Sequence, residues 1–289
     1  MKRITLLSVI AVVAFVTLAC GISFNLPVDE IVTGPTTVDE ILIPFPEEDA
    51  PAEVTLAFGA GELDLSAGAE NALIEGTAKY NISDFAPEID IHDTEVRLAT
   101  GDLELTGIPR LSIDDLENEW DLKLSDYPMD LKINAGAYQG DFDLGGLSLN
   151  SLEISDGAAE VRLDFSEPNK VDMSRFRYST GASSVKMTNL ANANFSMMTF
   201  RSGAGDYTLD FSGELQRDAN VVIESGISKI TIIVPEGMAA EISLKGGLTN
   251  VDADGDWDRS GSTYSLPGTG YQLTIQVEIG AGNLELRTY

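Results

Sequence analysis

The chain has almost no cysteine and almost no histidine: among its 289 residues, Cys20 and His92 are the only ones of their kind. A single cysteine cannot form an internal disulfide, so the stability of the fold must come from its packed core. One imidazole without a thiolate partner makes a poor transition-metal site. His92 would also be the sole imidazole base for a serine nucleophile, and no serine lies in a nucleophile-elbow motif.

Basic residues are scarce as well. Lys and Arg number 18 against 47 Asp and Glu, which gives a formal net charge of −29. We therefore expect neither nucleic acid nor anionic lipid to bind the surface at large. The charge favours solubility, bound cations or a basic partner, and a solvated acidic surface is the simpler interpretation. Hydrophobic residues make up 43% of the chain, enough for a packed core.

The N-terminus indicates export. A short basic start, residues 1–3, precedes an apolar run from Ile4 to Ala19. The run is shorter than the roughly 20 residues of a spanning helix, and residues 1–19 are typical of a secretory signal peptide. Its end, Thr17-Leu18-Ala19-Cys20-Gly21, resembles the lipobox of bacterial lipoproteins, although Thr17 replaces the usual Leu. The resemblance implies cleavage before Cys20 and a lipid on its sulfur; the alternative is an ordinary signal peptide or an uncleaved anchor.

Residues 20–51 are rich in proline and acidic residues, a composition typical of an extended, solvated tether. The motif Val-Asp-Glu-Ile occurs there twice, starting at Val28 and at Val38. One or both copies could add an edge strand to the following domain, but a spacer from the membrane is the simpler interpretation.

A repeat dominates the remaining chain: eight times a short strand runs into a glycine corner and a second short strand leaves it. Apolar residues recur five and three positions before the glycine and four and six positions after it, so they share one face. From the second corner to the seventh, the glycines are 21 to 24 residues apart. This period predicts an all-β parallel β-solenoid with coils of about 22 residues. The corner glycines are Gly59, Gly136, Gly157, Gly181, Gly203, Gly226, Gly247 and Gly280.

We expect glycine at the corners because the chain needs freedom in φ to turn there. Alanine follows the glycine in six of the eight repeats, and the exceptions are Ile227 and Leu248. If the coils stack in sequence order, the Gly280 coil is the last one and needs a cover, for which a second copy of the chain is one candidate. Residues 254–270 then form an exposed insertion, and the small Ala253 predicts weak packing beside it.

The region before the regular repeat holds the first corner and a β-rich cap. We expect strands at residues 73–80, 88–91, 95–99, 103–106 and 119–124, because apolar and polar residues alternate there. An open solenoid end exposes unpaired backbone groups and must be covered. We therefore assign residues 52–130 to an N-terminal β region with a cap at about 70–130, and residues 131–289 to the solenoid.

Several segments resemble one known family. They are Leu56-Ala57-Phe58-Gly59-Ala60-Gly61-Glu62-Leu63-Asp64-Leu65, Glu75 to Asn81, Trp120 to Leu124, and Pro128 to Ile133. Together they resemble the toast-rack family of bacterial cell-surface proteins and, more distantly, adhesin domains and the extracytoplasmic part of LiaF-type envelope-stress proteins. The resemblance covers residues 33–289. It implies a right-handed parallel β-solenoid outside the membrane and supplies no catalytic residue.

One acidic cluster is a candidate calcium site. In the run Asp252 to Asp258, carboxylates alternate with other residues, as they do in oxygen-rich Ca²⁺ loops. The candidate ligands are Asp252, Asp254 and Asp256, and no other cofactor is expected. Trp257 stands where an EF-hand needs glycine and Thr263 where it needs glutamate, so an acidic turn is the simpler interpretation. For His92, beside Asp90 and Asp93, we expect a structural or surface role.

These observations favour a non-enzymatic surface lipoprotein that presents a β-solenoid for binding, adhesion or scaffolding at the cell envelope. Its partner could be a protein, a glycan or a second copy of itself. The alternative is an extracytoplasmic sensor or modulator of envelope stress. A carbohydrate-active enzyme on a β-helix would need a cleft of clustered acids with aromatic platforms, and the repeats hold only scattered aromatics.

Overall fold

The computed structural model describes residues 33–101 and 116–289, where every regular element is a β-strand except two short 3₁₀ turns, Ser83–Phe85 and Leu190–Ala193. The expected all-β fold is confirmed. In the described part of the chain, no helix is long and apolar enough to cross a membrane. The signal peptide, Cys20, the first Val-Asp-Glu-Ile copy and the strand expected at 103–106 lie outside the described residues.

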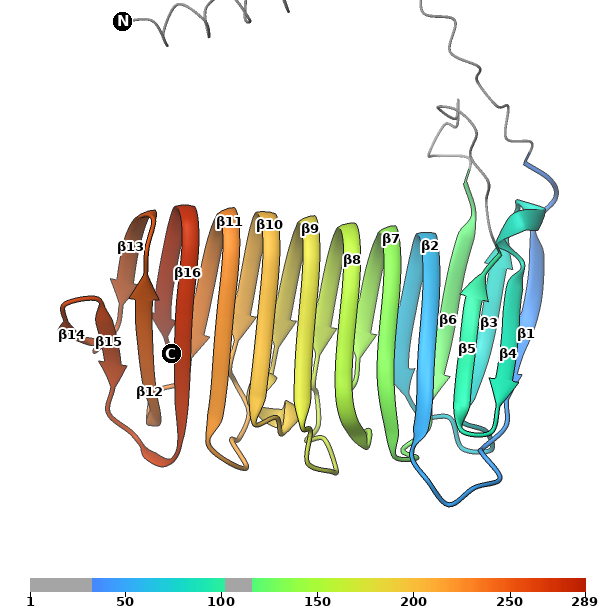
Figure 1. Cartoon of the computed structure of the whole chain (residues 1–289), viewed down its shortest axis with the longest axis horizontal. Coiled ribbons are helices and arrows are strands. Elements are labelled where there is room, and N and C mark those ends of the chain that lie inside the picture. Colours follow the sequence, from blue (N-terminus) through green and yellow to red (C-terminus); the bar gives the residue numbers. More distant parts are fainter. Residues whose placement is uncertain (1–32, 102–115) are drawn as a thin grey trace, which may run out of the picture. The chain divides into compact units, whose positions relative to one another are not determined.

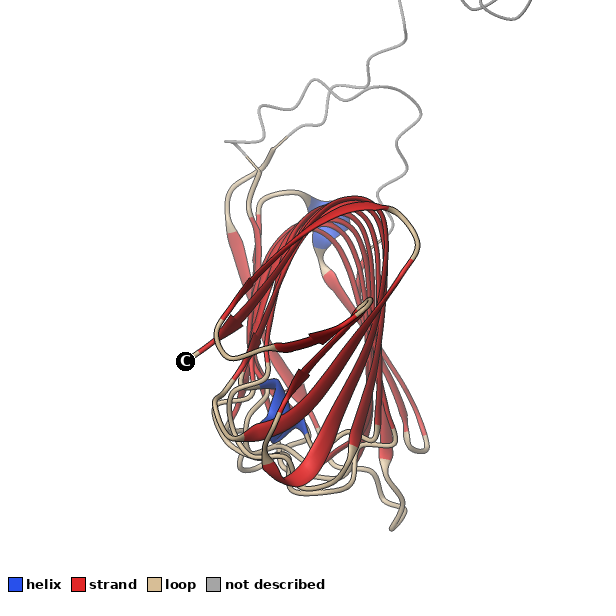
Figure 2. Ribbon diagram, turned by 90° about the vertical axis from the view of Figure 1, so that its left-hand side faces the viewer, coloured by secondary structure: helices blue, strands red, loops and turns tan. Residues whose placement is uncertain are grey.

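All the described strands belong to one sheet system. Seven long strands bend over the glycine corner and so contribute to both faces of the stack (Figures 1 and 2). The strands are β1 (Thr37–Ile43), β2 (Ala52–Ala67), β3 (Ile74–Tyr80), β4 (Pro87–His92), β5 (Glu95–Thr100), β6 (Asn118–Leu124), β7 (Met129–Asp143), β8 (Leu149–Asp164), β9 (Arg175–Thr188), β10 (Met197–Asp210), β11 (Ala219–Val234), β12 (Met238–Lys245), β13 (Leu248–Asp254), β14 (Asp258–Ser260), β15 (Thr263–Leu266) and β16 (Thr269–Thr288).

In the middle of the stack, each long strand pairs in parallel with the next one along the chain. The order β2-β7-β8-β9-β10-β11 is unbroken. Equivalent repeat positions face each other: Leu131 is opposite Leu152, and Phe176 is opposite Met198. The strands expected from alternation at 73–80, 88–91, 95–99 and 119–124 are present as β3, β4, β5 and β6.

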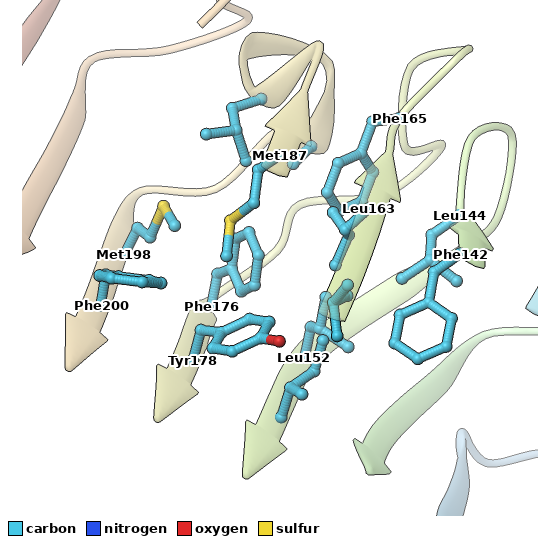
Figure 3. Packing of buried hydrophobic residues seen from close by; sticks show 14 of the residues in the cluster. Phe142, Leu144, Leu152, Leu163, Phe165, Phe176, Tyr178, Met187, Met198 and Phe200 are labelled. Atoms are coloured by element: carbon cyan, nitrogen blue, oxygen red, sulfur yellow. The ribbon is translucent and has the colours of Figure 1, made fainter. Parts of the chain in front are cut away.

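The inward side chains of these strands form one continuous core. The four repeat positions chosen from the sequence are buried in the central coils, and their aromatic rings interleave, as with Tyr178 and Phe200, whose centroids are 5.6 Å apart. Figure 3 shows these rings beside Met187 and Met198. Burying such a side chain contributes about 1.5–3 kcal/mol, which is what holds the stack together without disulfides.

The C-terminal end does not follow the sequence order. Strand β16 pairs in parallel with β11 on one side and with β12 and β13 on the other. The Gly280 coil therefore lies between the Gly226 and Gly247 coils, and our expectation that it ends the stack is wrong (Figure 1). After β11 the chain builds the outer coil first and then returns through β14 and β15 to fill the gap. A strand in that gap has two neighbours, so Ile275 and Leu284 become fully buried.

The segment 254–270 is not simply an exposed insertion. Its strand β15 runs antiparallel to β12, with Tyr264 opposite Ile242 and Leu266 opposite Ala240. Tyr264 and Leu266 are only 3% and 7% exposed, so this part of the expectation is wrong. The weak packing expected at Ala253 is confirmed, because that residue is exposed.

The N-terminal end has a matching arrangement. Strand β2 lies between β7 and the pair β5 and β6, and it is parallel to all three. Beyond them β4, β3 and β1 add antiparallel neighbours. The second Val-Asp-Glu-Ile copy lies in β1, so the edge-strand alternative is right for this copy and the spacer interpretation is wrong. The domain limits that we placed at residues 51 and 130 stay predictions.

The corner glycines are needed for a different reason than the one we expected. The seven glycines on the long strands do not have positive φ; only Gly247 does, at 78°, in the turn between β12 and β13. Instead, each corner packs against the backbone of the one before it. A Cβ added to Gly203 would lie 2.5 Å from the carbonyl oxygen of Gly181, and one added to Gly280 would lie 2.8 Å from that of Gly226. Close stacking, not freedom to turn, excludes a side chain there.

Candidate functional site

Two further repeat positions face each other beneath the corner, the residue before the glycine and the residue two after it. In the Gly181 coil they are Thr180 and Ser183, whose hydroxyl oxygens are 2.5 Å apart. In the Gly226 coil they are Ser225 and Ser228, and Ser225 Oγ donates to Ser228 Oγ at 2.8 Å. These positions do not stand out in an apolar pattern, because in most coils they carry polar or small residues.

The same position before Gly157 is occupied by the half-buried Asp156, whose carboxylate accepts hydrogen bonds from hydroxyl groups of the coils on either side. Tyr178 Oη donates to Asp156 Oδ2 at 2.7 Å and Tyr138 Oη donates to the same oxygen at 3.4 Å. Thr180 donates to Oδ1, and Ser183 Oγ reaches it at 3.4 Å. A charge at the edge of a core needs such donors to replace water.

Burial raises the pKa of both tyrosines, Tyr138 and Tyr178, above the ordinary value, and the nearby charge of Asp156 raises it further. Both phenols therefore stay protonated at neutral pH and can only donate to the carboxylate. This arrangement stabilises the corner.

On the outside of the corner, directly over this cluster, lies a shallow groove of 810 Å³ that crosses several coils. Its floor is the row of alanines that follow the corner glycines, and three glutamates stand along it. The next member of the alanine row is Ile227, 70% exposed, which interrupts the row at β11. The alanines are Ala60, Ala137, Ala158, Ala182 and Ala204, and the glutamates are Glu62, Glu119 and Glu160.

The surface next to the groove is strongly acidic. Parallel pairing places Asp121 beside Asp64, and Asp64 beside Asp141, on β6, β2 and β7. Burial raises the pKa of Asp64, and repulsion from Asp141 and Asp121 raises it further. Few cations balance these charges: Lys79 Nζ lies 3.2 Å from Glu119 Oε2, and Arg162 Nη1 lies 3.9 Å from Asp141 Oδ2.

One buried polar atom at the β6 end of the groove has no hydrogen-bond partner among the described residues. Asn118 is 1% exposed and lines the groove. Its Nδ2 donates to the Ala60 carbonyl oxygen at 2.6 Å, but its Oδ1 accepts no hydrogen bond from the part of the chain that the structure describes. An unsatisfied buried carbonyl costs free energy that a ligand donor can recover.

The residues proposed for calcium have other contacts. Arg287 Nη2 donates to Asp252 Oδ2 at 2.8 Å, while Asp254 and Asp256 are exposed. Trp257, at the position where an EF-hand has glycine, is half-buried against the core. Among the residues that the structure describes, no three His, Cys, Asp or Glu side chains form a group that could hold a metal ion. Calcium binding stays a prediction. His92 is exposed at the end of β4, opposite Glu95.

A comparison with protein families identifies the family of the chain. The model of the N-terminal domain of toast_rack, DUF2154, matches residues 32–187 and 169–233, more than half of the sequence. The protein belongs to the toast-rack family. The resemblance drawn from the sequence motifs is therefore confirmed.

Solved structures are similar to this chain at low sequence identity. A "putative cell adhesion protein" from Clostridium sporogenes ATCC 15579 is 19% identical, with a TM-score of 0.52, over 88% of this chain and 100% of that chain. A "putative lipid binding protein" from Parabacteroides distasonis ATCC 8503 is 11% identical, with a TM-score of 0.37, over 90% and 100%. A "putative adhesin" from Bacteroides fragilis NCTC 9343 is 7% identical, with a TM-score of 0.33, over 89% and 99%. No curated protein matches the sequence.

Proposed function

We propose that this protein is a non-enzymatic, adhesin-like binding protein of the cell surface, held at the membrane by a lipid on Cys20. In this proposal the coils wind as a right-handed parallel β-solenoid, and the solenoid is a rigid support for an outer binding surface. Family membership, the lipobox-like motif and the description of the Clostridium sporogenes protein as a cell adhesion protein support it. No observation on the described residues favours the envelope-stress alternative.

The observation that carries the proposal is the groove outside the corner. The interior of the central coils is filled by packed side chains, and its polar cluster serves the corner itself. The groove, in contrast, is accessible and crosses successive coils, with a floor of exposed alanines such as Ala158 and Ala182. Alanine methyl groups that leave room above them suit the binding of an elongated partner more than they suit chemistry.

The test is attachment of cells that display the full chain to immobilised proteins and polysaccharides. We expect attachment to at least one surface, and we expect Ala158→Trp, which fills the groove at an exposed position, to abolish it. Cys20→Ala should release the chain into the medium and remove attachment for a different reason, and metabolic labelling with a radioactive fatty acid should mark only the parent chain. Attachment that is equally strong with Ala158→Trp, or absent from every surface, would contradict the proposal.

A further inference from the structure

We infer that the groove over the corner binds an extended, lysine-containing peptide that crosses the coils from β6 to β10. This inference rests on the proposed binding function and names the class of its ligand. Three independent features of the groove support it: its floor, its charge and the unpartnered carbonyl at its end.

The floor suits an extended aliphatic chain. The five alanines lie in register on neighbouring strands, as in the pairs Ala60 with Ala137 and Ala182 with Ala204. Strands about 4.8 Å apart make the distance from β6 to β10 about 24 Å, which about seven residues of an extended peptide would span. The methylene stem of a lysine packs well on such methyl groups while its amine stays in water.

The floor suits a sugar polymer less well. Protein sites usually bind the apolar faces of sugar rings through exposed aromatic side chains, and the one aromatic residue that lines this groove, Tyr138, is only 5% exposed. Its hydroxyl is engaged with Asp156, so the ring is held beneath the surface. An amino-sugar chain is therefore the competing ligand that the experiment must separate from a peptide.

The charge of the groove selects a cation. Glu62 and Glu160 line it from β2 and β8, and Glu62 lies opposite Gln139 of β7, which contributes no charge. The adjoining row of Asp64 and Asp141 adds further negative potential, and the whole chain carries a net charge of −29. An ammonium group placed among these carboxylates would relieve their mutual repulsion, which Lys79 and Arg162 offset at Glu119 and Asp141.

The β6 end of the groove holds a polar atom without a donor. Among the described residues none donates to Asn118 Oδ1, while Nδ2 of the same side chain donates to the Ala60 carbonyl oxygen at 2.6 Å. Asn118 Oδ1 is enclosed in the free protein. A peptide N–H or a lysine ammonium is a donor of the right kind once the side chain turns toward the groove.

The experiment is fluorescence anisotropy of the full chain in a non-ionic detergent with two labelled decapeptides, one alternating lysine and alanine and the other alternating glutamate and alanine. We expect only the lysine peptide to bind, with an affinity that falls as NaCl rises. Glu62→Gln with Glu160→Gln should weaken binding about fivefold, since exposed charges contribute modestly. Ala158→Trp with Ala182→Trp should weaken it by about tenfold or more, because the side chains occupy the floor.

Matched controls lie away from the groove at exposed positions. Glu236→Gln with Glu241→Gln removes the same charge, and Asn220→Trp adds one of the same bulky side chains. Both control variants should bind the lysine peptide with an affinity within about twofold of the parent. This is a small effect, since a tenfold change in affinity corresponds to 1.4 kcal/mol. Melting curves of all variants should coincide, because every substituted residue is exposed.

Three outcomes would overturn the inference. If the tryptophan variant binds the lysine peptide as the parent does, the peptide is held by the acidic surface at large. If a labelled glucosamine oligomer displaces the peptide and binds more tightly, the groove takes an amino sugar. Should neither probe bind while cells displaying the chain still attach, and lose attachment with Ala158→Trp, this inference fails but the proposed function stands.

Discussion

The central coils and the two ends of the stack are built by different rules. From β7 to β11, consecutive strands pair in parallel, glycines stack on glycines and the core is sealed by the coils on either side. At both ends the chain departs from this order: β2 and β16 are inserted one coil inside, and antiparallel strands lie outside them. A coil needs a neighbour on each side. The repeat alone therefore cannot cover its own ends, and segments of the chain that do not follow the repeat are required there.

Removing a large side chain from the central coils should have the largest effect and tests the difference between the centre and the ends. Phe200→Ala should lower the free energy of unfolding by about 3–5 kcal/mol, because the ring is fully buried against Tyr178 and Tyr207. Val251→Ala, at the half-buried C-terminal end, should cost about 1 kcal/mol or less. Urea unfolding of both variants measures the difference. Equal losses would show that the ends are packed as tightly as the centre.

The glycine stack gives a second test at equivalent repeat positions. Gly203→Ala should destabilise the protein by about 3 kcal/mol, because the new Cβ would lie 2.5 Å from the Gly181 carbonyl oxygen. Gly59→Ala is the matched control, since its nearest neighbour, Thr100 Oγ1, is 3.3 Å away and belongs to a side chain that can shift. Thermal unfolding should separate the two by several degrees. If both are tolerated, close stacking does not explain the glycines.

The tyrosines beneath the corner should make stability sensitive to alkali. The pKa of both tyrosines is higher in the folded protein than the ordinary value of 10.0. As the pH rises, they therefore ionise in the unfolded chain before they ionise in the folded protein. The stabilisation from these tyrosines is then fully present below about pH 10. Above it, the free energy of unfolding falls by about 1.4 kcal/mol per pH unit for each tyrosine. Urea unfolding at pH 9 to 11 measures the slope. Tyr178→Phe should reduce it, whereas Tyr271→Phe, 50% exposed, should not.

The smallest expected effect concerns calcium at the C-terminal end. If Asp252, Asp254 and Asp256 bind Ca²⁺, millimolar calcium should raise the melting temperature by a few degrees, because a ligand that binds only the folded state stabilises it. Asp254→Ala with Asp256→Ala should remove the rise, and magnesium serves as the control ion. A melting temperature that calcium leaves unchanged would reject the site and leave Asp252 with Arg287 as its partner.

Some parts of the groove could be predicted from the sequence and others could not. The alanine row was visible as a repeat, but its exposure as the floor of a groove was not. The sequence could not predict the partner of Asn118, the cluster of hydroxyl groups around Asp156 or the role of Tyr138. Each depends on residues between 18 and 58 positions apart that meet only when the coils stack.

The alternation of apolar residues was enough to establish the strands, the all-β class and the four inward positions of the central coils, because these follow from local backbone geometry. The alternation did not establish the order of the coils, since β16 has the same repeat whether it stacks on β11 or beyond β13. Only the tertiary path of the chain decides which strands become neighbours. That path also creates the close glycine contacts, the hydroxyl cluster beneath the corner and the groove above it, because all three arise between coils rather than within one.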